Sequence, residues 1–272
     1  MVMKKGFWII LCMFFIPPVT FAGNMKLHYD RPAEYFEEAL VIGNGTMGAT
    51  LYGGVKKDKI SFNDITLWTG EPESENSSPD AFNTIPEIRA LLDNEDYQGA
   101  DKAQYKVQGH YSENYQPLGT LTIEYLDDTI GISDYHRWLD IGNATARTQY
   151  LKGGKLFTSD YFASAPDSVI VIRLKSENKE GIYALLSFDS PLPHSSQVAD
   201  NEISVEGYAA YHSFPVYYKA EDKHRYDPER GIHFKTLVRV LSVDGRVKNR
   251  YSDSRIEIDG STEVLILVAN VT

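Results

Sequence analysis

Five side chains in this sequence have the chemistry to contact a sugar: Asn44, Asn63, Trp68, Thr69 and Tyr115. Four of them lie in two adjacent blocks, ALVIGNGTMGATLYGG at 39–54 and KISFNDITLWTGEP at 59–72. An Asn amide both donates and accepts hydrogen bonds, and Trp or Tyr rings stack on the C–H faces of sugars. These five residues are therefore our candidates for the rim of a sugar site.

Two other roles would explain the same residues. Trp68 can seal a hydrophobic core, while Asn44 and Asn63 can satisfy the backbone of turns, and we favour this structural role over sugar contact. In a third alternative, the surface that carries Trp68 docks against another domain. Its apolar residues would then promote aggregation when that partner is missing.

Carboxylates for glycoside hydrolysis are abundant but poorly placed. An inverting glycosidase needs two of them roughly 6.5–9.5 Å apart, one with a raised pKa. Every acidic candidate lies in a polar or loop context, where solvated side chains are the rule: Glu37, Glu38, Glu71, Glu73, Asp127, Asp128 and Asp222. We therefore predict no catalytic residue in this chain.

No metal site is predicted either. Residues 221–227, EDKHRYD, mix acids and a His with Lys and Arg, which favours a solvated loop over a set of metal ligands. Three histidines are isolated in the sequence, and no G-x-S-x-G motif accompanies them: His110, His194 and His212.

The glycine block raises the question of a cofactor. Residues 43–48, GNGTMG, match the spacing G-x-G-x-x-G, but residues 49–54 have the pattern of a strand. Without a following helix there is no helix N-terminus to hold a pyrophosphate. We predict a tight β-connection with glycines at positive φ, and no cofactor.

The N-terminus has the pattern of an export signal. Lys4 and Lys5 precede an apolar run at 7–16, and Thr20-Phe21-Ala22 is a small-x-small cleavage site. The run is too short to span a membrane. We predict a signal peptide at 1–22 and a periplasmic or extracellular protein. Cys12 lies in this signal, so the mature chain would contain no disulfide.

Charge argues against nucleic acid as a partner. The net charge is −11, and no basic cluster is longer than Lys56-Lys57. A surface of this kind cannot neutralise a phosphate backbone. We predict neither nucleic-acid binding nor membrane association after signal cleavage.

The mature chain reads as an all-β protein. Apolar or alternating runs of four to ten residues are broken by Gly, Asn, Asp or Pro, and Gly153-Gly154 and Asp244-Gly245 have the chemistry of hairpin turns. The predicted strands are 49–52, 59–63, 119–125, 134–139, 146–151, 155–163, 168–175, 183–189, 203–208, 232–242, 255–258 and 264–271. They predict two antiparallel sheets in a β-sandwich of the super-sandwich type, forming one domain over 25–272.

One helical insertion interrupts the strands. Ile85, Ile88, Leu91 and Leu92 repeat on one face, and Pro86 fits a first helical turn. A second short helix follows up to residue 108. We expect this amphipathic pair to cover an edge or face of a sheet.

Six blocks resemble glycoside hydrolase family 95, the α-L-fucosidase family. They occur in the family's order and cover essentially all of 25–272: EALVIGNGTMGATLYGGV (38–55), ISFNDITLWTGEP (60–72), IPEIRALL (85–92), YQPLGTLTIEY (115–125), YHRWLDIGNATARTQYLKGGKLFTSDYFASAPDSVIVIRL (135–174) and EVLILVANVT (263–272). The sequence departs from the family at Tyr35-Phe36, where a Trp is usual, and at Ile65, where an acidic residue is usual.

The resemblance implies that this is the N-terminal β-sandwich domain of such an enzyme. Family catalysis, the inverting hydrolysis of α-1,2-linked L-fucose, is carried by a later (α/α)6 barrel with a Glu acid and an Asn/Asp-activated water. Twelve helices need on the order of 140 residues, and only 84–108 are available. The implied partners are that catalytic barrel and fucosylated glycans, and the isolated chain is expected to be inactive.

Two alternatives to an accessory domain remain open: a free-standing carbohydrate-binding module, and a truncated product without a function of its own. Residues 263–272 form a buried-strand pattern that stops without a polar tail, from which we expect a fragment. The resemblance does not separate fucose from galactose as the sugar.

Overall fold

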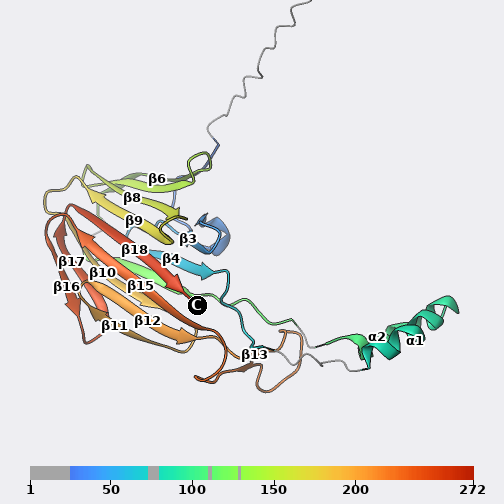
Figure 1. Ribbon diagram of the computed structural model, residues 1–272. Coiled ribbons are helices and arrows are strands. Elements are labelled where there is room, and N and C mark those ends of the chain that lie inside the picture. The colour runs from blue at the N-terminus through green and yellow to red at the C-terminus, as the bar shows by residue number, and fades with distance from the viewer. Residues whose placement is uncertain (1–24, 73–79, 110–111, 128–129) are drawn as a thin grey trace, which may run out of the picture.

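The protein is a β-sandwich with a pair of helices to one side (Figure 1). The computed structural model describes residues 25–72, 80–109, 112–127 and 130–272. The predicted signal segment, His110, Glu73 and Asp128 lie outside these described residues. All strand pairs within the two large sheets are antiparallel, which confirms the predicted fold class.

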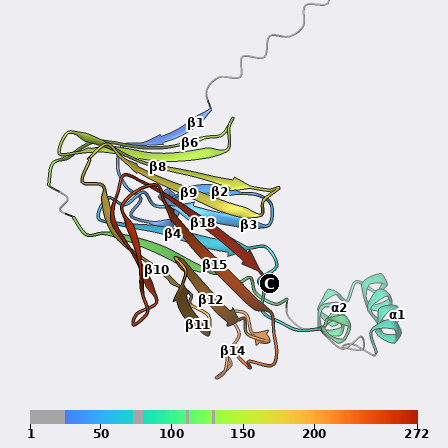
Figure 2. The same ribbon diagram turned by 60° about the vertical axis from the view of Figure 1, so that its left-hand side comes forward.

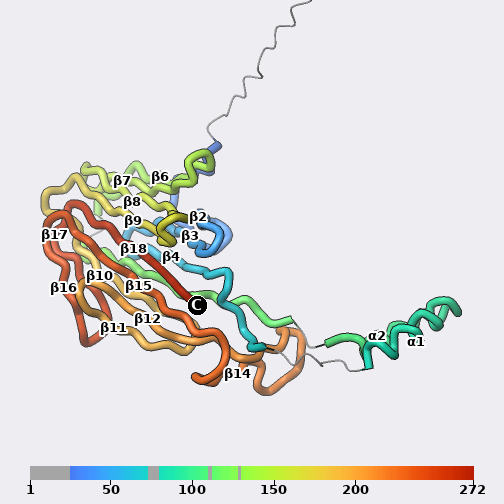
Figure 3. Tube along the Cα trace, viewed as in Figure 1, coloured from blue at the N-terminus to red at the C-terminus, as the bar shows by residue number. Residues whose placement is uncertain are grey.

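The larger sheet has nine strands. Their spatial order is β1 (Lys26–Tyr29), β6 (Ile132–Asp140), β7 (Thr145–Lys152), β8 (Lys155–Ser164), β9 (Val169–Ser176), β18 (Glu263–Val271), β15 (His233–Ser242), β12 (Glu202–Tyr208) and β11 (His194–Ala199). Figure 3 shows β18 in red, running through the middle of the molecule.

The second sheet has seven strands. Their order is β16 (Arg246–Arg250), β17 (Arg255–Ser261), β10 (Ile182–Asp189), β5 (Gly119–Tyr125), β4 (Lys57–Asp64), β3 (Met47–Leu51) and β2 (Leu40–Gly43). A small third sheet pairs β13 (His212–Ser213) with β14 (His224–Arg225).

Alternating side chains build the core between the two large sheets. On β4, Ile60 and Phe62 are fully buried, while Lys57 and Lys59 point to solvent. The same period of two recurs on β5 and β15, because successive residues of a strand face opposite sides of the sheet. Across the gap, the ring of Tyr125 packs edge-on against Phe157 at 5.4 Å. The buried apolar residues of both sheets form one hydrophobic cluster.

The twelve predicted strands and the hairpin turn at Gly153-Gly154 are confirmed. The second predicted hairpin is wrong, because the turn at Asp244-Gly245 connects β15 in the larger sheet to β16 in the smaller one, and these two strands do not pair. The additional strands β1, β2, β11, β13, β14 and β16 were not predicted. Most are short, polar or exposed, so their hydrophobic pattern carries little signal. The glycine block forms the β2–β3 hairpin and is followed by a strand, as expected, with Gly45 at φ +94°.

The helical insertion consists of α1 (Ala81–Asp93), α2 (Tyr97–Gln104) and the short 3-10 turn η2 (Tyr105–Val107). We call it the helical arm. Helix α1 begins before the predicted start, so Pro86 lies inside it rather than in its first turn.

The expectation that this pair covers a sheet is wrong. In both views the helical arm stands away from the sandwich (Figures 1 and 2). Its buried residues, Thr84, Ala100 and Ala103, are small, which suits close packing of the two helices on each other. Phe82 remains 83% exposed, and Ile85 and Leu92 are also exposed. Within the described part of the chain, no helix is both long and apolar enough to cross a membrane.

Candidate functional site

Trp68 and Tyr115 form an exposed aromatic pair where two connecting segments meet. The two residues make an isolated antiparallel bridge, and their rings pack edge-on at 5.7 Å. Both side chains remain about two-fifths exposed, and the indole Nε1 of Trp68 donates to the carbonyl of Ile65 at 3.0 Å. Partial burial, followed by the charge of Asp64, raises the pKa of the Tyr115 hydroxyl. That hydroxyl therefore remains a hydrogen-bond donor at neutral pH.

Thr69, the next predicted site residue, is buried behind this pair. Its hydroxyl donates to Glu113 Oε2 at 2.5 Å and accepts the backbone N–H of Asn114 at 2.8 Å. Both hydrogen-bonding roles of the hydroxyl are thus used within the protein. Thr69 holds the segment after β4 against the segment before β5.

Glu113 is the hub of a hydrogen-bond network. Besides Thr69, its carboxylate accepts the backbone N–H of Ser213 at 3.0 Å and the Nδ1–H of His212 at 2.9 Å. A carboxylate has only acceptor sites, so Nδ1 of His212 must carry the proton. The contacts tie Glu113 to β13, about 100 residues later in the chain.

A serine and a histidine meet in the same network, but not as a nucleophile and base. The Ser213 hydroxyl lies 2.8 Å from His224 Nδ1 and also accepts the side-chain amide of Asn114 at 2.8 Å. Ser213 is only 1% exposed, and its hydroxyl already has His224 and Asn114 as partners. The arrangement fastens the β13–β14 hairpin to the Trp68–Tyr115 segments.

A second set of contacts between these segments lies beside the Glu113 network. Arg230 forms an ion pair with Glu71 and lies over the ring of Tyr211 at 3.6 Å. The pairing with Arg230 lowers the pKa of the Glu71 carboxyl. In addition, the N–H of Gly70 donates to the carbonyl of Ala210 at 2.9 Å. We call these three joined segments, 65–72, 113–117 and 209–232, the loop junction.

The end of β18 reaches the loop junction. Asn270 donates to the buried carboxylate of Asp64 at 2.8 Å, and the hydroxyl of Thr272 contacts that of Thr66. Asp64 also accepts the N–H of Thr66 at 2.9 Å, which forms the turn after β4. Residue 272, marked C in Figure 1, therefore lies beside the turn that follows β4.

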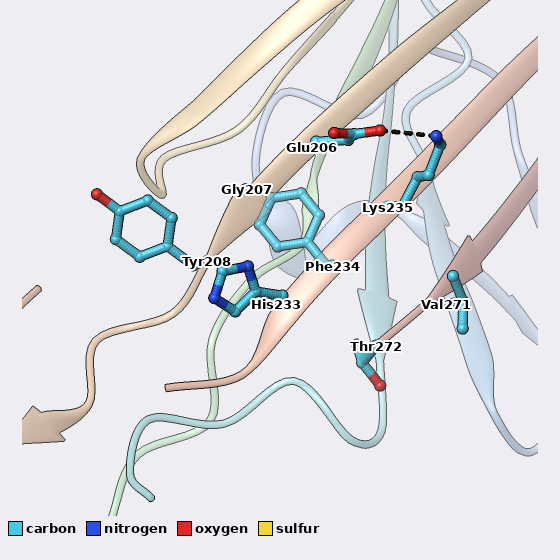
Figure 4. Close-up of a pocket in the computed structure, with 8 residues that line it drawn as sticks. All are labelled: Glu206, Gly207, Tyr208, His233, Phe234, Lys235, Val271 and Thr272. Carbon is cyan, nitrogen blue, oxygen red and sulfur yellow. Dashed lines mark ion pairs between the residues drawn. The ribbon is translucent and has the colours of Figure 1, made fainter. Parts of the chain in front are cut away.

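A shallow hollow opens at this end as well, shown in Figure 4. It has a volume of about 430 Å³, and the ion pair Glu206–Lys235 closes one side. The rings of Tyr208 and His233 lie 5.8 Å apart on another side. The hollow lies next to the loop junction and is lined in part by Val271 and Thr272 at the end of β18.

The remaining two predicted site residues lie elsewhere. Asn44 serves the β2–β3 turn: its side-chain oxygen accepts the N–H groups of Thr46 and Met47, and its amide donates to Ser164 at 3.0 Å. Asn63 projects from the outward face of β4. The structure thus brings together Trp68, Thr69 and Tyr115.

Sequence reasoning missed most of the loop junction. His212 and His194 are isolated in the sequence but have partners in the fold, where His212 contacts Glu113 and His194 contacts the carbonyl of Leu192. Residues 221–227 are largely exposed, as expected, although His224 within them contacts Ser213. No local spacing could reveal a pairing between residues so far apart in the chain. In the described part of the chain, no group of three or more His, Cys, Asp or Glu could hold a metal ion.

Comparisons with known proteins agree with the fold. A family model described as "Glycosyl hydrolase family 65, N-terminal domain" matches residues 27–272. Alpha-L-fucosidase 2 of Arabidopsis thaliana is 29% identical over 252 residues, 90% of this chain and 30% of that protein. A probable alpha-fucosidase A of Aspergillus niger is 29% identical over 72% of this chain, and one of Aspergillus oryzae is 25% identical over 85%.

These matches confirm the predicted resemblance to the N-terminal domain of a glycoside hydrolase. The matching family model, however, is that of family 65 and not of family 95. The fucosidase relatives agree with the predicted enzyme class. The chain spans only about 30% of the length of these curated relatives.

Proposed function

Because the chain belongs to the glycosyl hydrolase family 65 N-terminal domains, we propose that it is the accessory domain of an exported α-L-fucosidase-like enzyme. The family's catalytic barrel is its partner, and the chain alone is inactive. In this proposal the whole enzyme hydrolyses α-1,2-linked L-fucose, and this domain supports the barrel.

The observation that carries the proposal is that nearly the whole chain matches about 30% of the length of a fucosidase relative. A stable sandwich of this kind would act by packing against the remaining part of such an enzyme. The loop junction suits that role, because its polar side chains are fastened to each other while Trp68 and Tyr115 are presented outward. The exposed apolar residues of the helical arm, Phe82, Ile85 and Leu92, offer a second contact surface.

Inactivity is tested with the purified chain and 2′-fucosyllactose. We expect no release of L-fucose above the buffer control, measured by chromatography of the products. The Glu113 carboxylate contacts the candidate residue Thr69, and hydrogen bonds from Thr69, Ser213 and His212 already engage its oxygens. Release of fucose that follows the protein through successive purification steps would overturn the proposal.

Export is tested by the N-terminus of the protein recovered from its native host. Cleavage after Ala22 would leave a chain that begins at Gly23, which N-terminal sequencing detects. A cytoplasmic protein that retains residues 1–22 would contradict export.

A second candidate function, a free-standing carbohydrate-binding module, is favoured by the exposed Trp68–Tyr115 pair. Calorimetric titration with 2′-fucosyllactose distinguishes the two functions. A module would bind, and a Trp68→Ala variant would lose that binding. A matched Tyr183→Ala variant, altered at a partly exposed ring on β10, would not. An accessory domain without a glycan site at Trp68 would show no change between these variants.

A further inference from the structure

A polar row crosses four adjacent strands on the outward face of the seven-stranded sheet. Thr50 on β3 pairs in register with Ser61 on β4, Ser61 with Thr120 on β5, and Thr120 with Asp189 on β10. Directly paired residues of antiparallel strands project to the same face. The four side chains therefore stand side by side, away from the core.

This row lies in a hollow of about 440 Å³. Asn63, two residues after Ser61, projects to the same face. The lining is completed by Phe36, Phe62, Pro117, Gly119 and Pro191. The volume falls within the usual range for small-molecule sites, about 300–1,000 Å³. The site combines residues from η1 (Phe36–Glu38) and from four strands, so it exists only in the folded protein.

Thr50, which lines the hollow, has a hydroxyl without a partner within the described chain. The Oγ1 atom of Thr50 is buried without a hydrogen bond, and Thr50 as a whole is 5% exposed. An unsatisfied buried hydroxyl costs free energy, so a ligand that hydrogen-bonds to it gains a matching interaction. The neighbouring hydroxyls of Ser61 and Thr120 bond to each other at 3.1 Å and retain further capacity.

The other lining groups define the chemistry of the ligand. Asp189 is a carboxylate with an 87% exposed side chain, 3.5 Å from His194 Nε2. A carboxylate, an amide and three hydroxyls suit a neutral molecule with many hydroxyl groups, and the negative charge of Asp189 disfavours an acidic one. Phe36 is 59% exposed and offers an aromatic face to the C–H groups of a ring.

We propose that this hollow binds a neutral sugar residue, with Phe36 stacking on the ring and Thr50, Asn63 and Asp189 hydrogen-bonding its hydroxyls. The site is separate from the Trp68–Tyr115 pair. Its existence does not depend on the accessory role proposed above; only the choice of fucose as a first probe rests on that role.

Titration of the purified chain with L-fucose, D-galactose and D-glucose tests the site. We expect saturable binding of at least one of them at millimolar concentrations, measured by calorimetry. The side-chain amide signals of Asn63 should shift in parallel in NMR spectra. Asp189→Asn should weaken binding by about tenfold or more, because hydrogen bonds to charged groups are the stronger ones.

Thr50→Val separates ligand binding from folding. Valine keeps the shape of threonine and removes a hydroxyl that has no partner in the described chain, so the variant should unfold at the same urea concentration or higher. Its sugar affinity should nevertheless fall. Glu124→Gln, an exposed carboxylate farther along the same face of β5, is the control that should bind normally, and Trp68→Ala tests the aromatic pair as the alternative site.

Three results would overturn the site. They are the absence of saturable binding by all three sugars, binding unchanged in both Thr50→Val and Asp189→Asn, and binding lost only in Trp68→Ala. The last would place the sugar at the aromatic pair instead. None of them bears on whether the chain is an accessory domain, which the fucose-release assay addresses.

Discussion

Asp58 is a carboxylate buried between the two sheets. It faces inward from β4, is 1% exposed, and accepts hydrogen bonds from the Tyr161 hydroxyl and the Gly54 N–H, both at 2.9 Å. Burial outweighs these hydrogen bonds and raises the pKa of Asp58 to about 6. The charged form is therefore disfavoured in the folded state.

This shift predicts a loss of stability as the pH rises. Between about pH 4 and pH 6 the unfolded chain has released the Asp58 proton while the folded chain retains it. Each rise in pH there favours unfolding, by a total on the order of 3 kcal/mol. The Asp58→Asn variant lacks this pH-dependent contribution to the free energy of unfolding. The free energy of unfolding of the wild type minus that of the variant, from urea titrations, should fall across this window and level off above it; a constant difference would contradict the prediction.

Glu113 should stabilise the loop junction. Glu113→Ala leaves the buried Thr69 hydroxyl and the Ser213 N–H without their acceptor, at roughly 1–3 kcal/mol for each group. We expect a lower urea midpoint and faster amide exchange in residues 209–232. Glu221→Ala is the matched control, because Glu221 is an exposed acid within residues 209–232. It should change stability by less than about 0.5 kcal/mol. Equal effects of the two variants would refute the role of Glu113.

At the scale of single elements, the connection between β3 and β4 depends on a close backbone approach. A Cβ atom at Gly54 would overlap the carbonyl oxygen of Lys57, which is main chain and cannot swing aside. At Gly45, in the preceding hairpin, a Cβ would meet nothing within 4 Å, although φ is +94°. The two glycines are therefore required for different reasons.

These positions predict an ordered pair of variants. Gly45→Ala should cost roughly 1–2 kcal/mol, the strain of a positive φ in a residue with a side chain. Gly54→Ala should cost at least about 3 kcal/mol, because the backbone of β4 must move. Thermal unfolding of both variants measures the order, and an equal or smaller loss for Gly54→Ala would contradict the clash.

The helical arm leaves the sandwich and returns to it at neighbouring points. The Trp68–Tyr115 bridge and the bond from the Thr69 N–H to the Asn114 carbonyl join the chain before the arm to the chain after it. Two helices of 13 and 8 residues contribute little stability by themselves in water. Fast amide exchange is expected there, in contrast to β18 in the middle of the larger sheet.

For the whole molecule, the sandwich should therefore fold without the helical arm but not without β18. Replacing residues 80–109 by a short Gly–Ser linker should change the free energy of unfolding by no more than about 1 kcal/mol, since closing a loop depends weakly on its length. Removing β18 separates β9 from β15 in the larger sheet. It also removes the buried side chains of Val264, Ile266 and Val268, and so exposes the core residues that pack against them. Circular dichroism and urea unfolding distinguish the outcomes; an unfolded arm deletion would contradict this division.

The order of the strands in the sheets also decides where function can lie. The loop junction and residue 272 lie at one end of the sandwich, and the hollow on the outward face of the smaller sheet adjoins the loop junction, because Pro117 belongs to both. A domain docked on the loop junction would therefore lie beside the hollow.

Strand positions and turns could be predicted from the sequence because their physical causes are local. The alternation in 119–125 or 264–271 follows from side chains pointing to opposite faces, and Gly153-Gly154 permits a tight turn wherever it occurs. The six sequence blocks likewise indicated the N-terminal domain of a glycoside hydrolase without any knowledge of contacts.

The tertiary structure alone decided which distant residues meet. Glu113 contacts His212 across 99 positions, and Thr50, Ser61, Thr120 and Asp189 form one row only because β3, β4, β5 and β10 are neighbours in that register. The position of the helical arm was mispredicted for the same reason. An amphipathic pattern indicates that one face of a helix packs against something, but it does not identify the packing partner. Sheet order and register come from long-range pairing of the whole chain, which no local spacing records.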